Sequence, residues 1–420
     1  MSDGAIRQAV ILAGGKGTRL GEITREVPKP MLPIGDRPFL DYLIEMIERH
    51  GYEDILLLGG YRGEVLEAAY DGRRIGGATT RVMREQAPLG TAGALTVARG
   101  ALDPRFLMMN GDAFFDINLR ALEQASRQSG AMATLALRSV EDAARYGRVV
   151  EERGKVVAFL EKDTSRPGPG IINGGIYVLK REILELVREL PCSLEQDVFP
   201  VLVERGQIRA LKFGGYFLDI GMPETLERGR RELPKARLRP AAVFDRSALI
   251  SFAEGGPEAF HWTEGAVEAT RALNDRGYYV FVVGHEPEGA RRTLLANNSR
   301  LNAAMRERLA AEGAHVDQFY DEPHSQACPS DPAPQGARQA ASKACPVPGL
   351  DPGIAEGDAP APVSVGAVWI KAVDEWPIVR EKSFFIGVSG DDAEAARGAG
   401  IEPHAFDGGD LARLIHSLLA

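Results

Sequence analysis

Short apolar runs of strand length alternate with stretches of helical period in the first half of the chain. The clearest runs lie at 9–12, 55–58, 106–109, 133–137 and 176–179, and the helical stretches include 39–49 and 119–128. Buried strands that alternate with amphipathic helices are typical of an α/β layer fold with a mainly parallel sheet. Because the pattern continues to about Leu233, we predict a first domain over residues 1–233.

A second α/β pattern follows a basic segment bracketed by prolines. This segment, residues 234–240, is predicted to be a linker. The domain predicted over residues 241–420 contains strands at 241–244, 278–283 and 384–387, and helices at 267–276, 300–312 and 393–397. Residues 323–362 are rich in Pro, Ala, Gly, Ser and Asp and have no clear period, which predicts a loose insertion.

Composition narrows the class of protein. An apolar fraction of 44% is ample for real cores, and a net charge of −9 provides no global basic field for nucleic acid or an anionic membrane. Cys192, Cys328 and Cys345 cannot all pair within the chain and form no disulfide framework. No signal-peptide pattern or bilayer-length apolar run occurs. We therefore expect a cytoplasmic protein with no nucleic-acid or membrane partner.

The strongest chemical signal follows the first predicted strand. Residues 12–19, Leu-Ala-Gly-Gly-Lys-Gly-Thr-Arg, are followed ten residues on by Pro-Lys-Pro-Met at 28–31. Glycines after a strand let backbone N–H groups face a phosphate, while an arginine fork and a lysine charge suit phosphate oxygens. The motif is not a P-loop, because Gly17 separates Lys16 from Thr18, and a dinucleotide fingerprint would need glycine at Leu20. A tight turn without a ligand is the alternative.

These motifs resemble the signature of the sugar nucleotidyltransferase family, and the resemblance covers roughly residues 6–233. It implies a Rossmann-like α/β/α sandwich that transfers a nucleotidyl group from an NTP to a sugar 1-phosphate and releases pyrophosphate. It also implies nucleotide contacts by Leu12, Ala13, Gly14, Gly15, Gly17, Thr18, Arg19, Lys29, Glu85, Gln86, Gly90 and Asp112.

Two aspartates are the candidate metal ligands. Asp112 follows a buried strand and Asp219 follows another apolar run, at the position where α/β folds keep their sites. Two carboxylates can jointly hold Mg²⁺ on phosphate oxygens. The resemblance assigns Mg²⁺ to both aspartates and makes them catalytic together with Arg19 and Lys29. It places the sugar and its phosphate on Gly147, Glu161, Lys162, Asn173 and Gly174.

Each of these motifs also has an ordinary structural explanation. Residues 88–94 fit a helix N-terminus built on Thr91, and either aspartate alone fits a cap or a turn. Glu161 and Lys162 fit a solvated pair. Only the occurrence of all the motifs together favours a substrate site.

Residues 110–116, 193–200 and 219–224 look most similar to the D-glycero-D-manno-heptose 1-phosphate guanylyltransferase branch. Mannose-1-phosphate guanylyltransferases are a near second, so GTP is the favoured nucleotide. The other hypotheses are a different hexose-1-phosphate nucleotidyltransferase, a regulatory protein that binds nucleotide sugars without making them, and a bifunctional transferase and phosphatase. The sequence leaves the sugar, the base and the oligomeric state open, a homo-oligomer included.

The second domain resembles haloacid-dehalogenase-type (HAD-like) phosphatases, nearest the heptose bisphosphate phosphatases, at Ala-Val-Phe-Asp-Arg, 242–246. Several active-site positions depart from that pattern. Ser247 stands at the general acid, Val388 at a metal-binding aspartate, and 282–286 at a Thr-Asn-Gln motif. Asp245 without an acid and a metal ligand should be nearly inert, which predicts a non-catalytic domain. His324, Cys328 and Cys345 lack the spacing of a closed zinc site.

Overall fold

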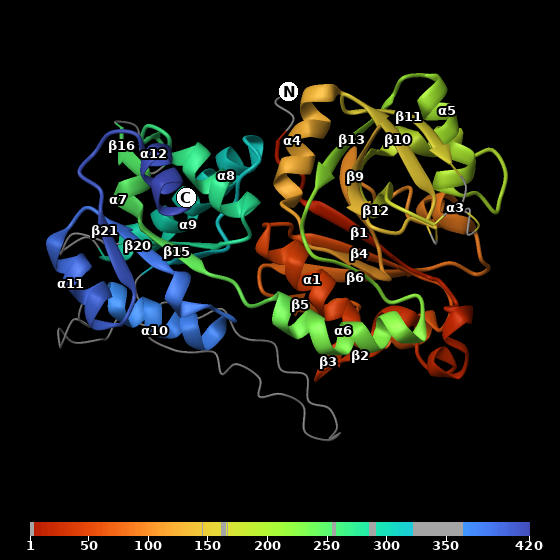
Figure 1. The fold of residues 1–420 in the computed structure, drawn as a ribbon, viewed down its shortest axis with the longest axis horizontal. Helices are drawn as coiled ribbons and strands as arrows, with labels where there is room; N and C mark the ends of the chain where they lie inside the picture. Colours follow the sequence, from red (N-terminus) through yellow and green to blue (C-terminus); the bar gives the residue numbers. More distant parts are fainter. Residues whose placement is uncertain are drawn as a thin grey trace.

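The computed structural model describes residues 4–144, 146–160, 165, 167–253, 258–284, 291–321 and 364–420. Within this part of the chain two sheets, each with helices on both faces, occupy the two halves (Figure 1). The predicted insertion at 323–362 lies wholly outside the described residues. No helix among the described residues is both long enough and apolar enough to cross a membrane.

The N-terminal sheet has 10 strands in the order β10-β11-β13-β9-β12-β7-β1-β4-β6-β5. Their bounds are β1 Gln8–Ala13, β4 Asp54–Gly59, β5 Arg74–Ile75, β6 Ala78–Arg84, β7 Arg105–Asn110, β9 Ala133–Val140, β10 Arg148–Glu152, β11 Lys155–Leu160, β12 Gly170–Lys180 and β13 Ile208–Phe213.

This sheet is mixed, so the expectation of a mainly parallel sheet is wrong. Strand β1 pairs in parallel with β4 and β7, whereas β12 runs antiparallel to both β7 and β9. The physical reason is that β12 is as apolar and as buried as the strands of this sheet that pair in parallel. A buried apolar run therefore identifies a central strand without revealing its direction.

Helices cover both faces of this sheet. On one face lie α1 (Phe39–Arg49), α2 (Gly63–Tyr70), α4 (Leu119–Ser129) and α6 (Pro223–Ala236). On the other lie α3 (Gly90–Val97) and α5 (Phe199–Glu204). Side chains of β1 alternate between the two cores: Ile11 enters the first and Val10 the second. The remaining strands are short pairs, β2 (Pro33–Ile34) with β3 (Arg37–Pro38), and β8 (Ala113–Phe115) with β14 (Phe217–Asp219).

The C-terminal sheet is parallel throughout its five strands, in the order β19-β18-β15-β20-β21. Strands β15 (Ala241–Asp245) and β18 (Tyr279–Val283) are continuous apolar runs because both of their faces are buried. The others are β19 (Gln318–Tyr320), β20 (Phe384–Gly387) and β21 (Glu402–Ala405).

Two helical layers enclose the C-terminal sheet. Helices α8 (Ala266–Asp275), α9 (Arg291–Ala311) and α12 (Leu411–Leu418) share one core with it, and α10 (Val365–Glu375) and α11 (Gly390–Gly398) share the other. A short helix, α7 (Arg246–Leu249), and a hairpin of β16 (Ile250–Phe252) and β17 (Phe260–Trp262) complete this half. Pro234 lies inside α6, so the predicted linker is helical as far as Ala236.

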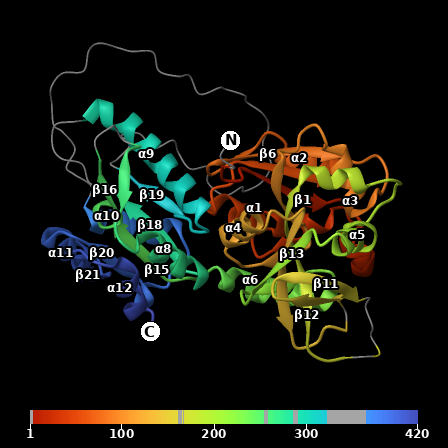
Figure 2. The same cartoon turned by 90° about the horizontal axis from the view of Figure 1, so that it is seen from above.

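Helix α4 lies on the flank of the N-terminal half that faces the C-terminal half (Figures 1 and 2). Its N-cap residue Asn118 donates from Nδ2 to Asp275 Oδ1 at 2.8 Å and to the Gly313 carbonyl at 2.9 Å. Nearby, the rings of His50 and His315 lie 4.1 Å apart between centroids, and both residues are buried. A buried polar interface therefore joins the two halves.

The histidine pair predicts an acid-sensitive structure. Burial lowers the pKa of both His50 and His315, and the charge of His315 lowers the pKa of His50 further. The unfolded chain therefore takes up protons near the ordinary histidine pKa before the folded chain does, and stability falls as pH drops. We expect each histidine to remove roughly 1 kcal/mol of stability between pH 7.5 and 6.0, lowering the thermal unfolding midpoint.

The His50→Gln variant should lose part of this pH dependence, because one of the two buried groups no longer titrates. His416→Gln, at an exposed histidine of α12, should behave like the unsubstituted chain. Thermal melts at both pH values measure the effect. If the unfolding midpoint stays constant or rises as the pH falls to 6.0, the histidine pair does not cause a loss of stability in acid.

Candidate active site

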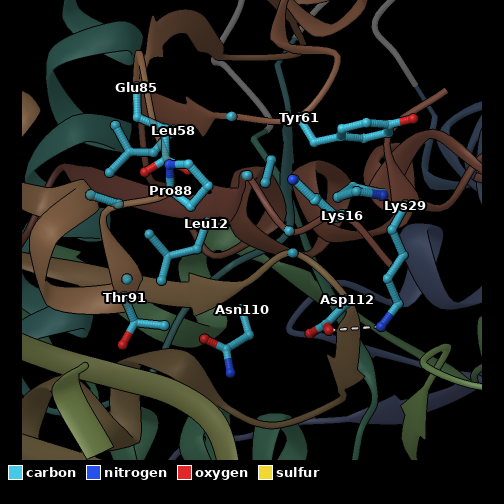
Figure 3. A pocket seen from close by; sticks show the side chains of 18 of the residues that line it. Leu12, Lys16, Lys29, Leu58, Tyr61, Glu85, Pro88, Thr91, Asn110 and Asp112 are labelled. Carbon is cyan, nitrogen blue, oxygen red and sulfur yellow. Dashed lines mark hydrogen bonds and ion pairs between the residues drawn. The ribbon is translucent and has the colours of Figure 1, made fainter. Parts of the chain in front are cut away.

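Adjoining cavities open where β1 and β7 end. Figure 3 shows the side chains that line the first of them. The first has a volume of about 620 Å³ and the second about 390 Å³, and Lys29, Asn110 and Asp112 line both. A third cavity of about 860 Å³ shares Tyr146 and Asn173 with the second. Strand ends of one sheet thus supply the walls of a connected site.

Most of the predicted site residues line these cavities. The first cavity is lined by Leu12, Ala13, Gly14, Gly15, Lys29, Glu85, Gln86, Gly90 and Asp112. The second is lined by Gly15, Gly17, Thr18, Arg19, Lys29, Asp112, Asn173, Gly174 and Asp219, and the third by Gly147 and Asn173. Glu161 and Lys162 lie outside the described residues.

The glycine loop turns sharply between β1 and a 3-10 helical segment, Thr18–Thr24. Gly17 has φ of +62°, and its carbonyl accepts from the backbone N–H of Leu20 at 2.8 Å. A Cβ at position 17 would lie 2.9 Å from Cγ2 of Thr24. Glycine is therefore required here both by the backbone angle and by the close approach of Thr24.

Lys29 is the central charge of the site. Although buried, it directs its Nζ to Asp112 Oδ2 at 2.7 Å, and Asp219 Oδ1 lies 3.9 Å away. Asp112 directly precedes β8 and Asp219 ends β14, and the pairing of these strands places Asp219 in register with Ala113, the residue after Asp112. The structure therefore brings together the two acids that the sequence predicted as partners.

This pair of acids carries more negative charge than Lys29 balances. Burial raises the pKa of Asp219, the nearby charge of Asp112 raises it further, and Lys29 opposes both effects. A divalent cation would relieve this repulsion, and carboxylate oxygens are the ligands that Mg²⁺ prefers. The described residues include no group of three or more His, Cys, Asp or Glu side chains that could bind a metal by themselves. The two carboxylates fit a Mg²⁺ ion whose other ligands include phosphate oxygens of the substrates.

A carboxylate and a helix start form the far end of the first cavity. Glu85 Oε2 accepts from the backbone N–H of Leu89 at 3.3 Å, and burial raises the pKa of Glu85. Helix α3 begins at Gly90, whose φ of +79° and contact with the backbone of Cys192 exclude a side chain. The alternative of a helix built on Thr91 is half right, since the helix starts there but no side chain caps it.

The side chain of Thr91 instead contacts Glu195, a residue that the sequence did not mark. Its Oε2 accepts from Thr91 Oγ1 at 3.0 Å, and its Oε1 accepts from the hydroxyl of Tyr177 at 3.0 Å. Tyr177 in turn accepts from Asn173 Nδ2 at 2.7 Å. Glu195 therefore connects the helix start at the first cavity with the asparagine shared by the other two.

Other residues at the cavity walls had no predicted role. Asn110 lies inside the 110–116 motif, and its buried Oδ1 has no hydrogen-bond partner among the described residues. Tyr61, Tyr146 and Phe217 also line the cavities. All four residues lie at or within two residues of a strand end, which was the available signal in the sequence.

The arrangement is suited to two anions bound side by side. A buried lysine and two carboxylates lie at the junction of two cavities, and Arg19 lines the second of them. Cationic groups and a carboxylate-held metal can offset the repulsion between phosphate groups and fix their alignment.

Comparisons with known proteins identify relatives of the first half of the chain. The model of the "Nucleotidyl transferase" family matches residues 8–235. The chain is 35% identical to a D-glycero-alpha-D-manno-heptose 1-phosphate guanylyltransferase of Aneurinibacillus thermoaerophilus, over 54% of this chain and 98% of the relative. It is 37% identical to a mannose-1-phosphate guanylyltransferase of Mycobacterium tuberculosis, over 54% of this chain and 64% of the relative.

A crystal structure of HddC from Yersinia pseudotuberculosis is also similar, with a TM-score of 0.49 and 30% identity. The similarity covers 54% of this chain and all of that one. The Aneurinibacillus relative is covered almost in full by a match to just over half of this chain.

Proposed function

The chain belongs to the nucleotidyl transferase family over residues 8–235, and on this premise we propose that it joins GTP and a sugar 1-phosphate into a GDP-sugar. The sugar we favour is D-glycero-D-manno-heptose, with mannose second, in line with the names of the heptose and mannose relatives. The observation that carries the proposal is Lys29 between two carboxylates at the junction of two cavities.

The reaction follows from charge. A phosphate oxygen of the sugar 1-phosphate forms a bond to the α-phosphorus of GTP, and the bond to the bridging oxygen breaks as pyrophosphate leaves with the electron pair. No general base is needed, because the attacking oxygen is already ionised. Arg19 and Lys29 offset the charge of the departing pyrophosphate, and the alignment of the two anions supplies most of the rate. Lys162, outside the described residues, is our expected contact for the sugar phosphate.

Asp112 and Asp219 would hold Mg²⁺. When bound, the ion supplies positive charge that binds phosphate oxygens and stabilises the charge that develops on them. Burial raises the pKa of Asp219 and the nearby charge of Asp112 raises it further, so a cation that binds both carboxylates would favour their ionised forms.

Glu85 supports a preference for guanine as the base. Guanine presents a ring N–H and an amino group side by side, and a carboxylate that only accepts hydrogen bonds matches both donors. Uracil and thymine instead offer a single N–H between two carbonyl groups, and a carboxylate repels the oxygens of those carbonyl groups. Glu85 lines the first cavity, and only one hydrogen bond to its carboxylate comes from the described backbone, so acceptor capacity remains for a base.

For the C-terminal half we propose a HAD-like domain that has lost catalysis. Asp245 ends β15, and its carboxylate accepts from the backbone N–H of Ser247, as an N-cap of α7. Arg246 pairs with Asp321 and donates to Asn298 Oδ1 at 3.1 Å. Its guanidinium lies where a Cβ on Gly284 would be, at the end of β18. Arg246, the residue after the would-be nucleophile, is thus buried and ion-paired, and the Asp245 carboxylate caps α7, an arrangement that supports an inert site.

The described residues leave out five other positions of this half that the sequence motifs include: His285, Glu286, His324, Cys328 and Cys345. The proposal therefore rests on the parallel sheet, Asp245 and Arg246. A live phosphatase, the bifunctional alternative, finds no support in this arrangement.

Asp112→Asn should reduce pyrophosphate release at least about 1,000-fold, because the site loses one of two anionic ligands and the partner of Lys29. Release is measured with GTP, the sugar 1-phosphate and Mg²⁺. Asp245→Asn is the matched control: it makes the same chemical change in the other half and should leave the rate unchanged. Substantial activity in the first variant would remove Asp112 from the mechanism, and an equal loss in the second would mean that the effect is not specific to the transferase site.

Glu85→Gln should narrow the preference for GTP over UTP by about 10- to 100-fold, because one carboxylate acceptor is replaced by an amide donor. The measurement is kcat/KM for each nucleotide at saturating sugar 1-phosphate. Glu64→Gln, at an exposed position of α2, is the control and should leave the ratio unchanged. An unaltered ratio in the Glu85 variant would mean that other groups choose the base.

A further inference from the structure

Both proposed metal ligands are carried by one small ribbon of strands β8 and β14. At its near end the backbone N–H of Ile220 donates to the Asp112 carbonyl at 3.0 Å, next to Asp219. At its far end the N–H of Asp116 donates to the Tyr216 carbonyl at 2.8 Å. Only residues 113–115 separate Asp112 from Asp116. A shift at the far end is therefore transmitted to both carboxylates over a very short distance.

The far end is held by arginines from both halves of the chain. Asp116 pairs with Arg49, the last residue of α1, at 3.4 Å, and with Arg239, which lies just before β15. Arg49 also pairs with Asp317 of the C-terminal half at 3.1 Å. The four side chains form a line of alternating charge, and none of them is more than 14% exposed.

Arg239 is itself fixed to the C-terminal half. Its N–H donates to the Pro377 carbonyl at 3.1 Å, and its own carbonyl accepts from Val379 at 2.8 Å. The ring of Tyr279 lies beneath its guanidinium, 5.5 Å from ring centroid to Cζ. The position of Asp116 is thereby tied to the C-terminal sheet rather than to a free loop.

We propose that Arg239 is a positioning residue, through which the C-terminal half holds the β8–β14 ribbon and places Asp112 and Asp219 against Lys29. This inference rests on the proposed function of that site. The family match ends at residue 235, before Arg239, and the Aneurinibacillus relative is matched almost in full by 54% of this chain. The second half thus serves the transferase reaction without a catalytic group of its own.

A second contact across the same interface provides the control. Arg271 of α8 donates to Gln124 Oε1 at 2.5 Å, on the flank of α4 and away from the ribbon. Its loss weakens the junction between the halves without touching Asp116. Any effect that belongs to the ribbon alone should therefore appear in Arg239 variants and be absent from Arg271→Ala.

The test uses the full chain and begins with hydrogen–deuterium exchange, which does not depend on knowing the substrate. Arg239→Ala should increase exchange of peptides spanning 112–116 and 216–220, while Arg239→Lys, which keeps the charge, should restore most of the protection. Arg271→Ala should leave these peptides unchanged. Equal exchange in all variants, or equal loosening in Arg239→Ala and Arg271→Ala, would overturn the proposal.

Kinetics then test the consequence for the reaction. Arg239→Ala should lower kcat for pyrophosphate release at least about 10-fold with KM values within twofold, because positioning rather than binding is lost. Arg239→Lys should regain most of that rate, and Arg271→Ala should match the unsubstituted chain. If the ribbon loosens and kcat does not change, the positioning role is wrong. If the unsubstituted chain releases no pyrophosphate, the proposed function fails, and the exchange data still decide whether Arg239 holds the ribbon.

Discussion

The buried charge of Lys29 has to be balanced, and Asp112 and Asp219 balance it. Burial removes several kcal/mol of hydration from an ammonium group. The carboxylates must stay close to Lys29 because their charge offsets this loss. This requirement explains the pairing of β8 with β14, which holds the two acids side by side. It also explains why the site forms where β1 and β7 end, since the Lys29 loop, Asp112 and the glycine loop meet there.

The same electrostatic logic extends to the other half of the chain. Asp116 is a third carboxylate close to Asp112 and Asp219 along the ribbon, with its side chain 14% exposed, and it is balanced by Arg49 and Arg239. Helix α4 begins directly afterwards, and its N-cap Asn118 also contacts the C-terminal half. The polar residues that build the proposed catalytic ribbon and those that join the two halves therefore lie within a few positions of one another.

Much of the site was predictable because strand ends are marked by local pattern. An apolar run followed by Asp112, and the glycine loop after β1, identify positions that parallel strands bring together at one edge. Strand direction was not predictable, and β12 is antiparallel although it is as apolar as its neighbours.

The hydrogen bonds of Glu195 and the Arg239–Asp116 pair were also missed. Each joins residues 18 to 123 positions apart. A single charged side chain carries no periodic signal of its partner, so only the folded chain reveals these contacts.

Pyrophosphate release is the most direct test of whether this chain makes a GDP-sugar. The purified full chain with Mg²⁺ would be assayed with four NTPs against heptose, mannose and glucose 1-phosphates. We expect turnover with GTP, highest with D-glycero-D-manno-heptose 1-phosphate. Nucleotide binding without release from any pair would contradict it, and would instead favour a protein that binds nucleotide sugars without making them.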